Sequence, residues 1–221
     1  MTDNCHTLHE WFNSLRRFHF PFDKDLPLIP QNGIYILFEQ GEAFDQMDRV
    51  VRVGTHTGNN QLQFRLCQHF VDENKDRSIF RKNIGRCFLN KESHSYLKIW
   101  ELDFTTRDQR KTNPHLIDRI LQEQLEKRIS RYIQNNMTFS VIEVNHKSER
   151  LRLESRIVST VSLCKNCKPS DNWLGQHSPK SRIKESGLWQ VNELYKTPLN
   201  ADDMRKLKAL ICEYSFRDVL D

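Results

Sequence analysis

A carboxylate on an apolar helical stripe is the first feature of the sequence that could do chemistry. Residues 148–162 have the periodicity of an amphipathic helix. Its apolar stripe consists of Leu151, Ile157, Val158 and Val161. Glu154 falls on the same stripe, where a carboxylate is costly unless it is paired, hydrogen-bonded or bound to a metal ion. Glu154 is therefore a candidate metal ligand, and a salt bridge to Arg150 or Arg156 is the alternative.

A second candidate is the pair formed by Arg65 and His69. The two residues lie four positions apart on a helix predicted over residues 60–70, so they share one face of it. An arginine can hold phosphate oxygens through two parallel hydrogen bonds, and a histidine can exchange a proton near neutral pH. The pair fits hydrolysis of a phosphodiester, and two ordinary solvated side chains on a helix surface are the alternative.

Tyr35 lies in a predicted strand, residues 33–39, that reads GIYILFE. Alternation along the strand places Tyr35 and Leu37 on the face opposite Ile34 and Ile36. A tyrosine in a strand is more often a core or interface residue than a catalyst. Tyr35 alone therefore says little about function.

Cys164 and Cys167 have the spacing of half a zinc site. Two further ligands would have to come from elsewhere in the chain. The candidates are Cys87, His177 and Cys212, and no second pair has ligand spacing. A thioredoxin-like redox site is disfavoured because the motif follows a helix instead of opening one. A zinc-stabilised interaction protein is the function that this motif alone would favour.

The order of the predicted elements indicates how these residues are held. Helices are expected over residues 9–18, 60–70, 78–89, 115–136, 148–162 and 201–214. Strands are expected over residues 33–39, 49–55, 96–102 and 138–144, the first two forming a hairpin with a longish loop. Because the strands do not alternate regularly with helices, we predict an α+β fold with a small antiparallel or mixed sheet flanked by helices.

The composition limits the class of protein. The chain has 221 residues, of which 37% are hydrophobic and 29% charged, so it can bury a core and is not generally disordered. Its net charge of +5 is compatible with a polyanionic partner. No segment has the length and apolarity of a membrane span or a signal peptide. We therefore expect a cytoplasmic protein with reduced cysteines and no membrane partner.

The order of the motifs resembles that of the GIY-YIG nuclease superfamily. The series consists of Gly33-Ile34-Tyr35 opening a strand, Arg52-Val53-Gly54 ending the next, Arg65 on a helix, Glu154 on a later helix and Asn172 in the loop after it. The loop around Asn172 and the spacing of Arg65 and His69 look like those of stand-alone and restriction-type members. Arg52 stands where the family usually has a tyrosine.

The resemblance implies a site that hydrolyses a phosphodiester with one divalent cation, Mg²⁺ or Mn²⁺. In that site Glu154 would bind the cation, Arg65 would stabilise the charge building at phosphorus, and Tyr35 would position or activate water. His69 would relay or accept the proton, and Asn172 would orient the phosphate or the neighbouring side chains.

Arg52 leaves two functions open. If Arg52 fills part of the role of the missing tyrosine, the chain is an active endonuclease, for instance of restriction type. If it does not, the chain is a DNA-binding protein on a nuclease fold that has lost its chemistry. Double-stranded DNA is the expected partner in both cases, and cutting at a palindrome would favour a homodimer on the DNA.

Basic residues on two predicted helices are candidates for the surface that contacts DNA. They are Arg77, Arg81, Lys82, Arg86, Lys127, Arg128 and Arg131. Contacts of this kind to phosphates position a duplex without reading its sequence.

We expect residues 1–221 to form one domain. A GIY-YIG-like core would span residues 32–175, with an insertion at about 90–136. An N-terminal helix and loop, residues 1–31, and a C-terminal helical extension, residues 176–221, would flank it.

Overall fold

The computed structural model describes residues 4–105 and 116–217, and these residues form an α+β fold around a four-stranded antiparallel sheet. The strands are β1 (Phe18–His19), β2 (Gly33–Phe44), β3 (Met47–Gly54) and β4 (Met137–Glu143). Their order across the sheet is β1-β4-β2-β3, and every neighbouring pair is antiparallel. The predicted fold class is confirmed.

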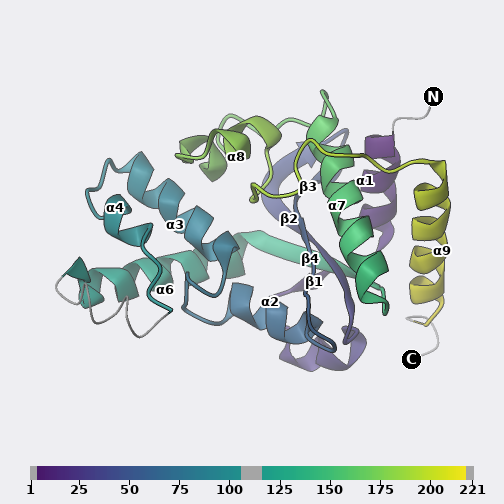
Figure 1. Ribbon diagram of the computed structural model, residues 1–221, viewed down its shortest axis with the longest axis horizontal. Helices are drawn as coiled ribbons and strands as arrows, with labels where there is room; N and C mark the ends of the chain where they lie inside the picture. Colours follow the sequence, from purple (N-terminus) through teal and green to yellow (C-terminus); the bar gives the residue numbers. More distant parts are fainter. Residues whose placement is uncertain (1–3, 106–115, 218–221) are drawn as a thin grey trace.

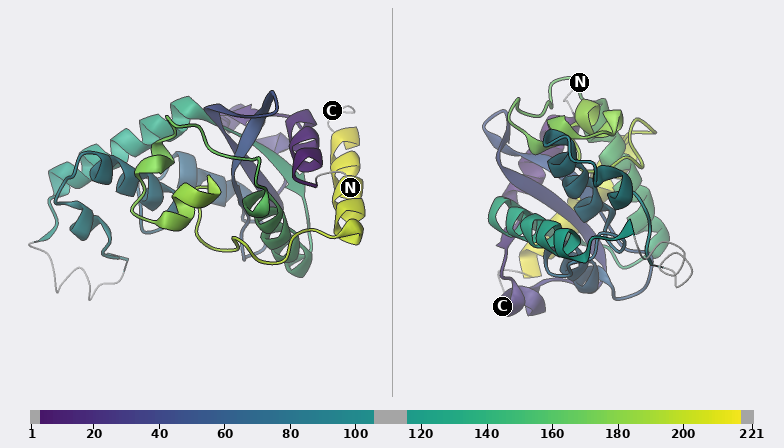
Figure 2. Two further views of the ribbon diagram at one scale, coloured as in Figure 1. Left: turned by 90° about the horizontal axis from the view of Figure 1, so that it is seen from above. Right: turned by 90° about the vertical axis from the view of Figure 1, so that its left-hand side faces the viewer.

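Helices lie on both sides of this sheet. They are α1 (Asn4–Ser14), α2 (Leu62–Phe70), α3 (Ile79–Lys91), α4 (Leu97–Trp100), α6 (Arg119–Asn136), α7 (Lys147–Leu163), α8 (Ser181–Ser186) and α9 (Ala201–Arg217), with 3₁₀ helices η1 (Asp23–Leu28) and η3 (Leu174–His177). At one end of the molecule α1, α7 and α9 lie beside the sheet, and at the other α3, α4 and α6 form an elongated arm (Figures 1 and 2). None of the described helices is long and apolar enough to span a bilayer.

β2 and β3 form a hairpin that is tighter than predicted. Its connection is a two-residue turn at Asp45 and Gln46, whose φ angles are 45° and 65°. A turn with two positive φ angles matches the twist of paired strands, so both strands continue up to it and the expected longish loop is wrong. β2 lies in the interior of the sheet, and residues 33–39 are buried on both faces, which accounts for their apolar run.

The outer edge of β3 is covered by a segment from late in the chain. Trp189 donates its backbone N–H to Val51 O at 2.8 Å, and Gln190 Oε1 accepts the N–H of Val53 at 3.1 Å. An uncovered edge strand would present these backbone groups to other chains. The segment at Trp189 and Gln190 therefore completes the sheet on the side of β3.

Glu39 on β2 holds that segment in place. Its buried carboxylate accepts hydrogen bonds from the indole N–H of Trp173 at 2.9 Å, from that of Trp189 at 2.7 Å and from the hydroxyl of Tyr132. Burial raises the pKa of Glu39, and the three hydrogen bonds oppose that effect. One side chain of the central hairpin thus fixes two tryptophans that lie 134 and 150 residues further along the chain.

Residues 96–102 form the short helix α4 and its flanks, so the predicted strand is wrong. Tyr96 and Trp100, four residues apart, are both buried. The indole of Trp100 donates to Lys82 O at 2.9 Å and lies against Gly85, where a Cβ would come within 2.4 Å of the ring. Packing of one large side chain onto α3 therefore decides the structure of a segment whose alternation alone favoured a strand.

The remaining predicted helices and strands are present with shifted ends. α1 stops at Ser14, because Phe18 leaves the helix and pairs in β1. His115, the expected start of the long helix, lies outside the described residues. α6 follows Asp118, whose side chain accepts the N–H of Leu121 at 3.0 Å and caps the helix.

Candidate active site

Tyr35 is the centre of a buried hydrogen-bond network. Its hydroxyl lies 2.7 Å from His69 Nε2, and Arg52 Nε donates to it at 3.2 Å. His69 Nδ1 lies 2.7 Å from the hydroxyl of Ser78, which is the N-cap of α3. In the arrangement that gives the phenol proton an acceptor, Tyr35 donates to His69 and His69 donates to Ser78. The network joins β2, β3, α2 and α3.

His69 is held neutral by its surroundings. The side chain is fully buried, and this burial lowers its pKa well below the usual value. The guanidinium groups of Arg65, Arg52 and Arg81 lower the pKa further. A neutral imidazole can accept a hydrogen bond from Tyr35, and an anionic ligand beside the cluster would offset the charges of Arg52 and Arg65, since Arg81 is already paired with Glu126.

Gly54 makes room for the hydroxyl of Tyr35. The two residues are paired across β2 and β3. A Cβ on Gly54 would lie 2.3 Å from the Tyr35 hydroxyl oxygen, which is closer than two such atoms can approach. The glycine of the second motif is therefore required for the position of the first motif's tyrosine.

We expect Gly54→Ala to displace the ring of Tyr35 and to lower the stability of the fold by about 1–3 kcal/mol. Gly58→Ala is the control, because a Cβ there first meets the flexible side chain of Gln61. Thermal unfolding of both variants tests the prediction. An equal Tm for Gly54→Ala and the unmodified chain would contradict the close approach of Gly54 and Tyr35.

Glu154 lies half-buried on α7 and makes no hydrogen bond or ion pair within the described part of the chain. The alternative salt bridges are wrong. Arg150 binds backbone carbonyls, and Arg156 pairs with an aspartate of α9. Burial raises the pKa of Glu154 to about 7, against the attraction of Arg52 and Arg65. The fold thus leaves this carboxylate without a direct counter-charge.

Arg65 points from α2 toward the surface beside this network. Its Nη1 donates to Gln68 Oε1 and to the backbone O of Arg77, both at 2.8 Å. The guanidinium is half-buried and lines an open pocket. The lining residues are Thr55, His56, Thr57, Gln61, Phe64, Arg65 and Gln68. Since both bonds use Nη1, the other donors of Arg65 have no partner in the described chain and can serve a ligand.

Arg52, Arg65, His69, Glu154 and Tyr35 therefore form one cluster. Arg52 and Arg65 act electrostatically on both His69 and Glu154, and Arg52 binds Tyr35 directly. A model of the GIY-YIG domain matches residues 15–216, which include the whole cluster. The chain belongs to the GIY-YIG family. It matches no curated protein and no solved structure.

The GIY-YIG domain is nuclease-like, so its substrate is a nucleic acid, and GIY-YIG nucleases typically use a divalent metal ion. The family match also covers residues beyond 175, including the segment at Trp189 and Gln190. This segment touches the cluster, because Arg52 Nη1 donates to Trp189 O at 2.6 Å. The segment at Trp189 and Gln190 therefore contacts this cluster as well as the sheet.

Asn172 is the amide side chain predicted for the site, and Gln190 is a second amide side chain, which the structure places beside the residue that binds Arg52. Asn172 lies exposed in a turn, while its neighbour Trp173 points into the core toward Glu39. Gln190 is buried at the edge of β3, next to the carbonyl that binds Arg52. The sequence analysis missed Gln190, although Leu188 and Trp189 form a short apolar run directly before it in a polar segment.

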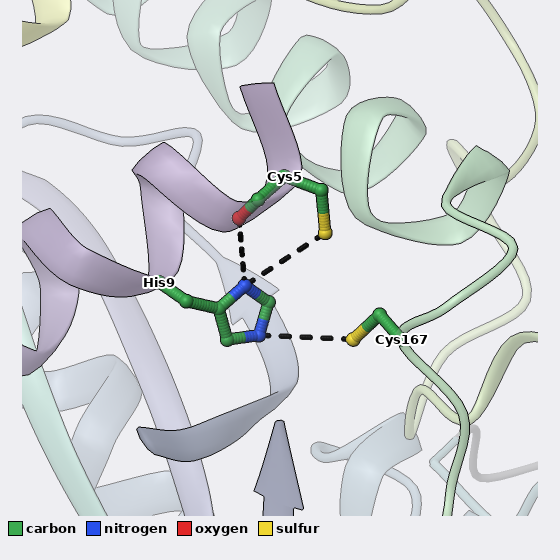
Figure 3. A group of neighbouring side chains, drawn as sticks. All are labelled: Cys5, His9 and Cys167. Carbon is green, nitrogen blue, oxygen red and sulfur yellow. Dashed lines mark hydrogen bonds between the residues drawn. The ribbon is translucent and has the colours of Figure 1, made fainter. Parts of the chain in front are cut away.

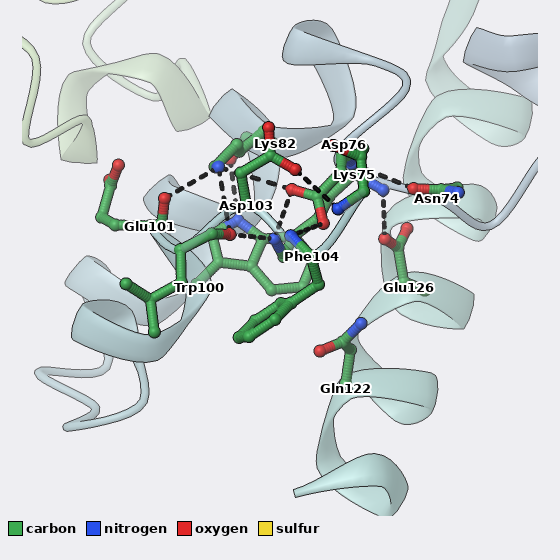
Figure 4. A network of polar contacts seen from close by, with 12 residues as sticks. Asn74, Lys75, Asp76, Lys82, Trp100, Glu101, Asp103, Phe104, Gln122 and Glu126 are labelled. Carbon is green, nitrogen blue, oxygen red and sulfur yellow. Dashed lines mark hydrogen bonds and ion pairs between the residues drawn. The ribbon is translucent and has the colours of Figure 1, made fainter. Parts of the chain in front are cut away.

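Three basic residues expected to contact DNA lie inside the GIY-YIG protein. Arg81 and Arg86 form ion pairs with Glu126 and Glu101 at 2.8 and 2.6 Å. Lys82 donates to the backbone O of Glu101 at 2.9 Å, within the polar network of Figure 4. The predicted exposed basic face on α3 is therefore wrong, because α3 is buried against its neighbours in the arm.

The other basic candidates lie at the surface. Arg77 is exposed in the turn before α3, and Lys127 and Arg131 are exposed on α6. Arg128 is half-buried and pairs with Glu92 at 2.6 Å. Lys127 is also paired, with Glu123 at 2.6 Å, so any contact of the GIY-YIG domain with phosphates through these residues would involve Arg77 and Arg131 before Lys127 and Arg128.

Proposed function

We propose that this GIY-YIG protein is a metal-dependent endonuclease that hydrolyses phosphodiester bonds of double-stranded DNA. One observation carries the proposal: Glu154 is half-buried, has no ion-pair partner in the described chain, and lies within the field of Arg52 and Arg65. An ionisable group that a fold strongly perturbs beside cationic side chains is typical of a site that awaits a ligand.

Glu154 would hold Mg²⁺ or Mn²⁺. Hard cations take oxygen ligands, and a single carboxylate leaves the rest of the coordination shell to phosphate oxygens and water. When bound, the cation supplies Lewis-acid polarisation of the phosphate and stabilises the leaving oxygen. The proposal fits the raised pKa of Glu154, since a nearby divalent charge favours the ionised carboxylate that the fold alone disfavours.

Tyr35 would position the attacking water and pass on its proton. The hydroxyl oxygen accepts from Arg52 and has one further lone pair for a water molecule, while its own proton points to His69. A proton taken from water would move through Tyr35 to the neutral His69. Because Tyr35 has no exposed surface in the free chain, substrate binding has to open the path of that water.

Arg52 supports the active form of the site over the inactive alternative. It stands at the position of the usual family tyrosine and donates to Tyr35, so it can take over part of the supporting role. Arg65 would neutralise the charge that builds on the phosphate. Asn172 is not part of this cluster, because Ser170 in the same segment binds Glu42, near the turn of the hairpin and away from Tyr35. The pocket beside Arg65, with the exposed ring of Phe64, is the place where the DNA strand would enter.

The test is digestion of mixed plasmid DNA by the purified protein with Mg²⁺ or Mn²⁺. We expect nicked or linear products that chelation of the cation with EDTA abolishes. Sequenced ends at a short palindrome would favour restriction-type cutting by a homodimer, and scattered ends would exclude it. Salt-sensitive DNA binding with no cleavage in either cation would overturn the proposal and favour a binding protein on a nuclease fold.

A further inference from the structure

Cysteine and histidine side chains from two distant parts of the chain meet next to α1. Cys5 and His9 lie four residues apart on one face of α1, and Cys167 comes from the segment after α7. The ligand atoms of these three residues all lie within 4.8 Å of one another, and all three are buried. Cys164, which precedes Cys167 by three positions, interacts with the Cys5 thiol but lies outside this 4.8 Å group, so it would have to move closer to become a fourth ligand.

The spacing of the ligand atoms fits a zinc ion. Figure 3 shows the two thiols and the imidazole pointing toward one another. Cys167 Sγ lies 3.7 Å from His9 Nε2, and one ligand atom from each of the three residues lies within 4.8 Å of the other two. Zinc bonds of about 2.3 Å to sulfur and about 2.0 Å to nitrogen place tetrahedral ligand atoms roughly 3.5 Å apart. The side chains are therefore close to the arrangement that zinc requires.

The tautomer of His9 is the one that a metal needs. Nδ1 lies 2.8 Å from the backbone O of Cys5, which can only accept, so Nδ1 carries the proton. The lone pair is then on Nε2, where the N–H of Val50 donates at 3.1 Å. A carbonyl on the distal nitrogen is the usual support of a metal-bound histidine. A cation bound at Nε2 would replace the hydrogen bond from the Val50 N–H. This N–H would then need another acceptor, and a thiolate bound to the cation can accept it.

We propose that Cys5, His9, Cys164 and Cys167 bind one Zn²⁺ as a structural site. The pairs are Cys-x₃-His on a helix and Cys-x₂-Cys in the loop after α7. Four protein ligands close the coordination sphere, so the site holds the fold and leaves no position for substrate. The partners of the Cys-x₂-Cys pair are thus Cys5 and His9, and not the candidates expected from the sequence. This site is separate from the cation at Glu154.

Metal analysis of the purified full chain tests the proposal. We expect about one zinc per chain. After replacement by Co²⁺, the spectrum should show thiolate-to-cobalt charge transfer and the d–d bands of a tetrahedral ion. Cys167→Ser and His9→Gln should lose the zinc, whereas Cys212→Ser should keep it, because Cys212 is exposed on α9 and outside the cluster. The readout does not depend on DNA cleavage, so it can fail or succeed independently of the nuclease proposal.

If the ligand variants do not fold, zinc removal from the unmodified chain tests the proposal. Removal of zinc with a strong chelator should lower Tm by roughly 10 °C or more, and added Zn²⁺ should restore it. Less than half an equivalent of zinc after purification with zinc present would overturn the proposal, as would full zinc retention by Cys167→Ser. A disulfide between Cys5 and Cys167 in freshly purified protein would overturn it too.

Discussion

Glu154→Gln is expected to reduce DNA cleavage by about 10³-fold or more. The substitution keeps the size of the side chain and removes the charge that would bind the cation. DNA binding should persist, because Arg65 and the exposed Arg77, Lys127 and Arg131 remain. Single-turnover cleavage with Mg²⁺ and a binding assay in Ca²⁺ or EDTA measure the two properties separately.

The same variant should be more stable than the unmodified chain when no divalent cation is present. Burial raises the pKa of Glu154 from 4.5 to about 7. The folded chain therefore loses stability as the pH rises from about 4.5 to about 7, since the unfolded carboxyl ionises first. The gain in the free energy of unfolding of Glu154→Gln over the unmodified chain should be small at pH 4.5 and reach about 1–3 kcal/mol at pH 8. Mg²⁺ should reduce it by stabilising only the unmodified chain.

Glu149→Gln is the matched control for both measurements. Glu149 lies on the same helix, α7, but faces another pocket together with Glu143 and Glu213. Its replacement should change neither the cleavage rate nor the dependence of Tm on Mg²⁺. Full cleavage activity of Glu154→Gln would show that Glu154 does not bind the metal ion.

Tyr35→Phe is expected to slow the chemical step by about 10²–10³-fold with little change in the KM for DNA. The variant lacks one oxygen atom, and with it the acceptor of Arg52 and the donor to His69. Leaving these buried groups without a partner should also cost about 1–3 kcal/mol of stability. Single-turnover cleavage and thermal unfolding measure the two effects.

Tyr132→Phe separates the two roles. Tyr132 also donates a hydrogen bond inside the protein, to Glu39, but takes no part in the cluster around Tyr35. We expect it to lose stability while keeping the cleavage rate. If Tyr35→Phe cleaves as fast as Tyr132→Phe at equal loss of stability, Tyr35 has a structural role only.

The sequence predicted those features whose cause is local. The position of Glu154 on an apolar stripe, and of Arg65 and His69 one helical turn apart, follows from periodicity. The absence of a partner for Glu154 does not follow from periodicity, because Arg156 pairs instead with Asp203, 47 residues further along the chain. Partner choice depends on tertiary contacts that periodicity does not contain.

Long-range contacts account for the other differences. The positive charges of α3 were predicted to contact DNA, yet Arg81 is neutralised by Glu126 from α6, 45 residues away. Gln190 was missed because its place is defined by the free edge of β3. Cys167 and His9 are 158 residues apart, so no spacing rule could join them. In each case a polar group finds its partner on an element that the sequence cannot place nearby.

The segment at Trp189 and Gln190 also determines when, during translation, the cluster around Tyr35 can form. Tyr35 and Arg65 leave the ribosome early, but the carbonyl that holds Arg52 and one of the indoles that bind Glu39 belong to Trp189. Because translation delivers the N-terminal parts first, a nascent chain contains most of the side chains that we propose to be catalytic long before it can hold them in place. Prematurely terminated products that end before residue 189 should therefore be inert toward the DNA of the cell that makes them.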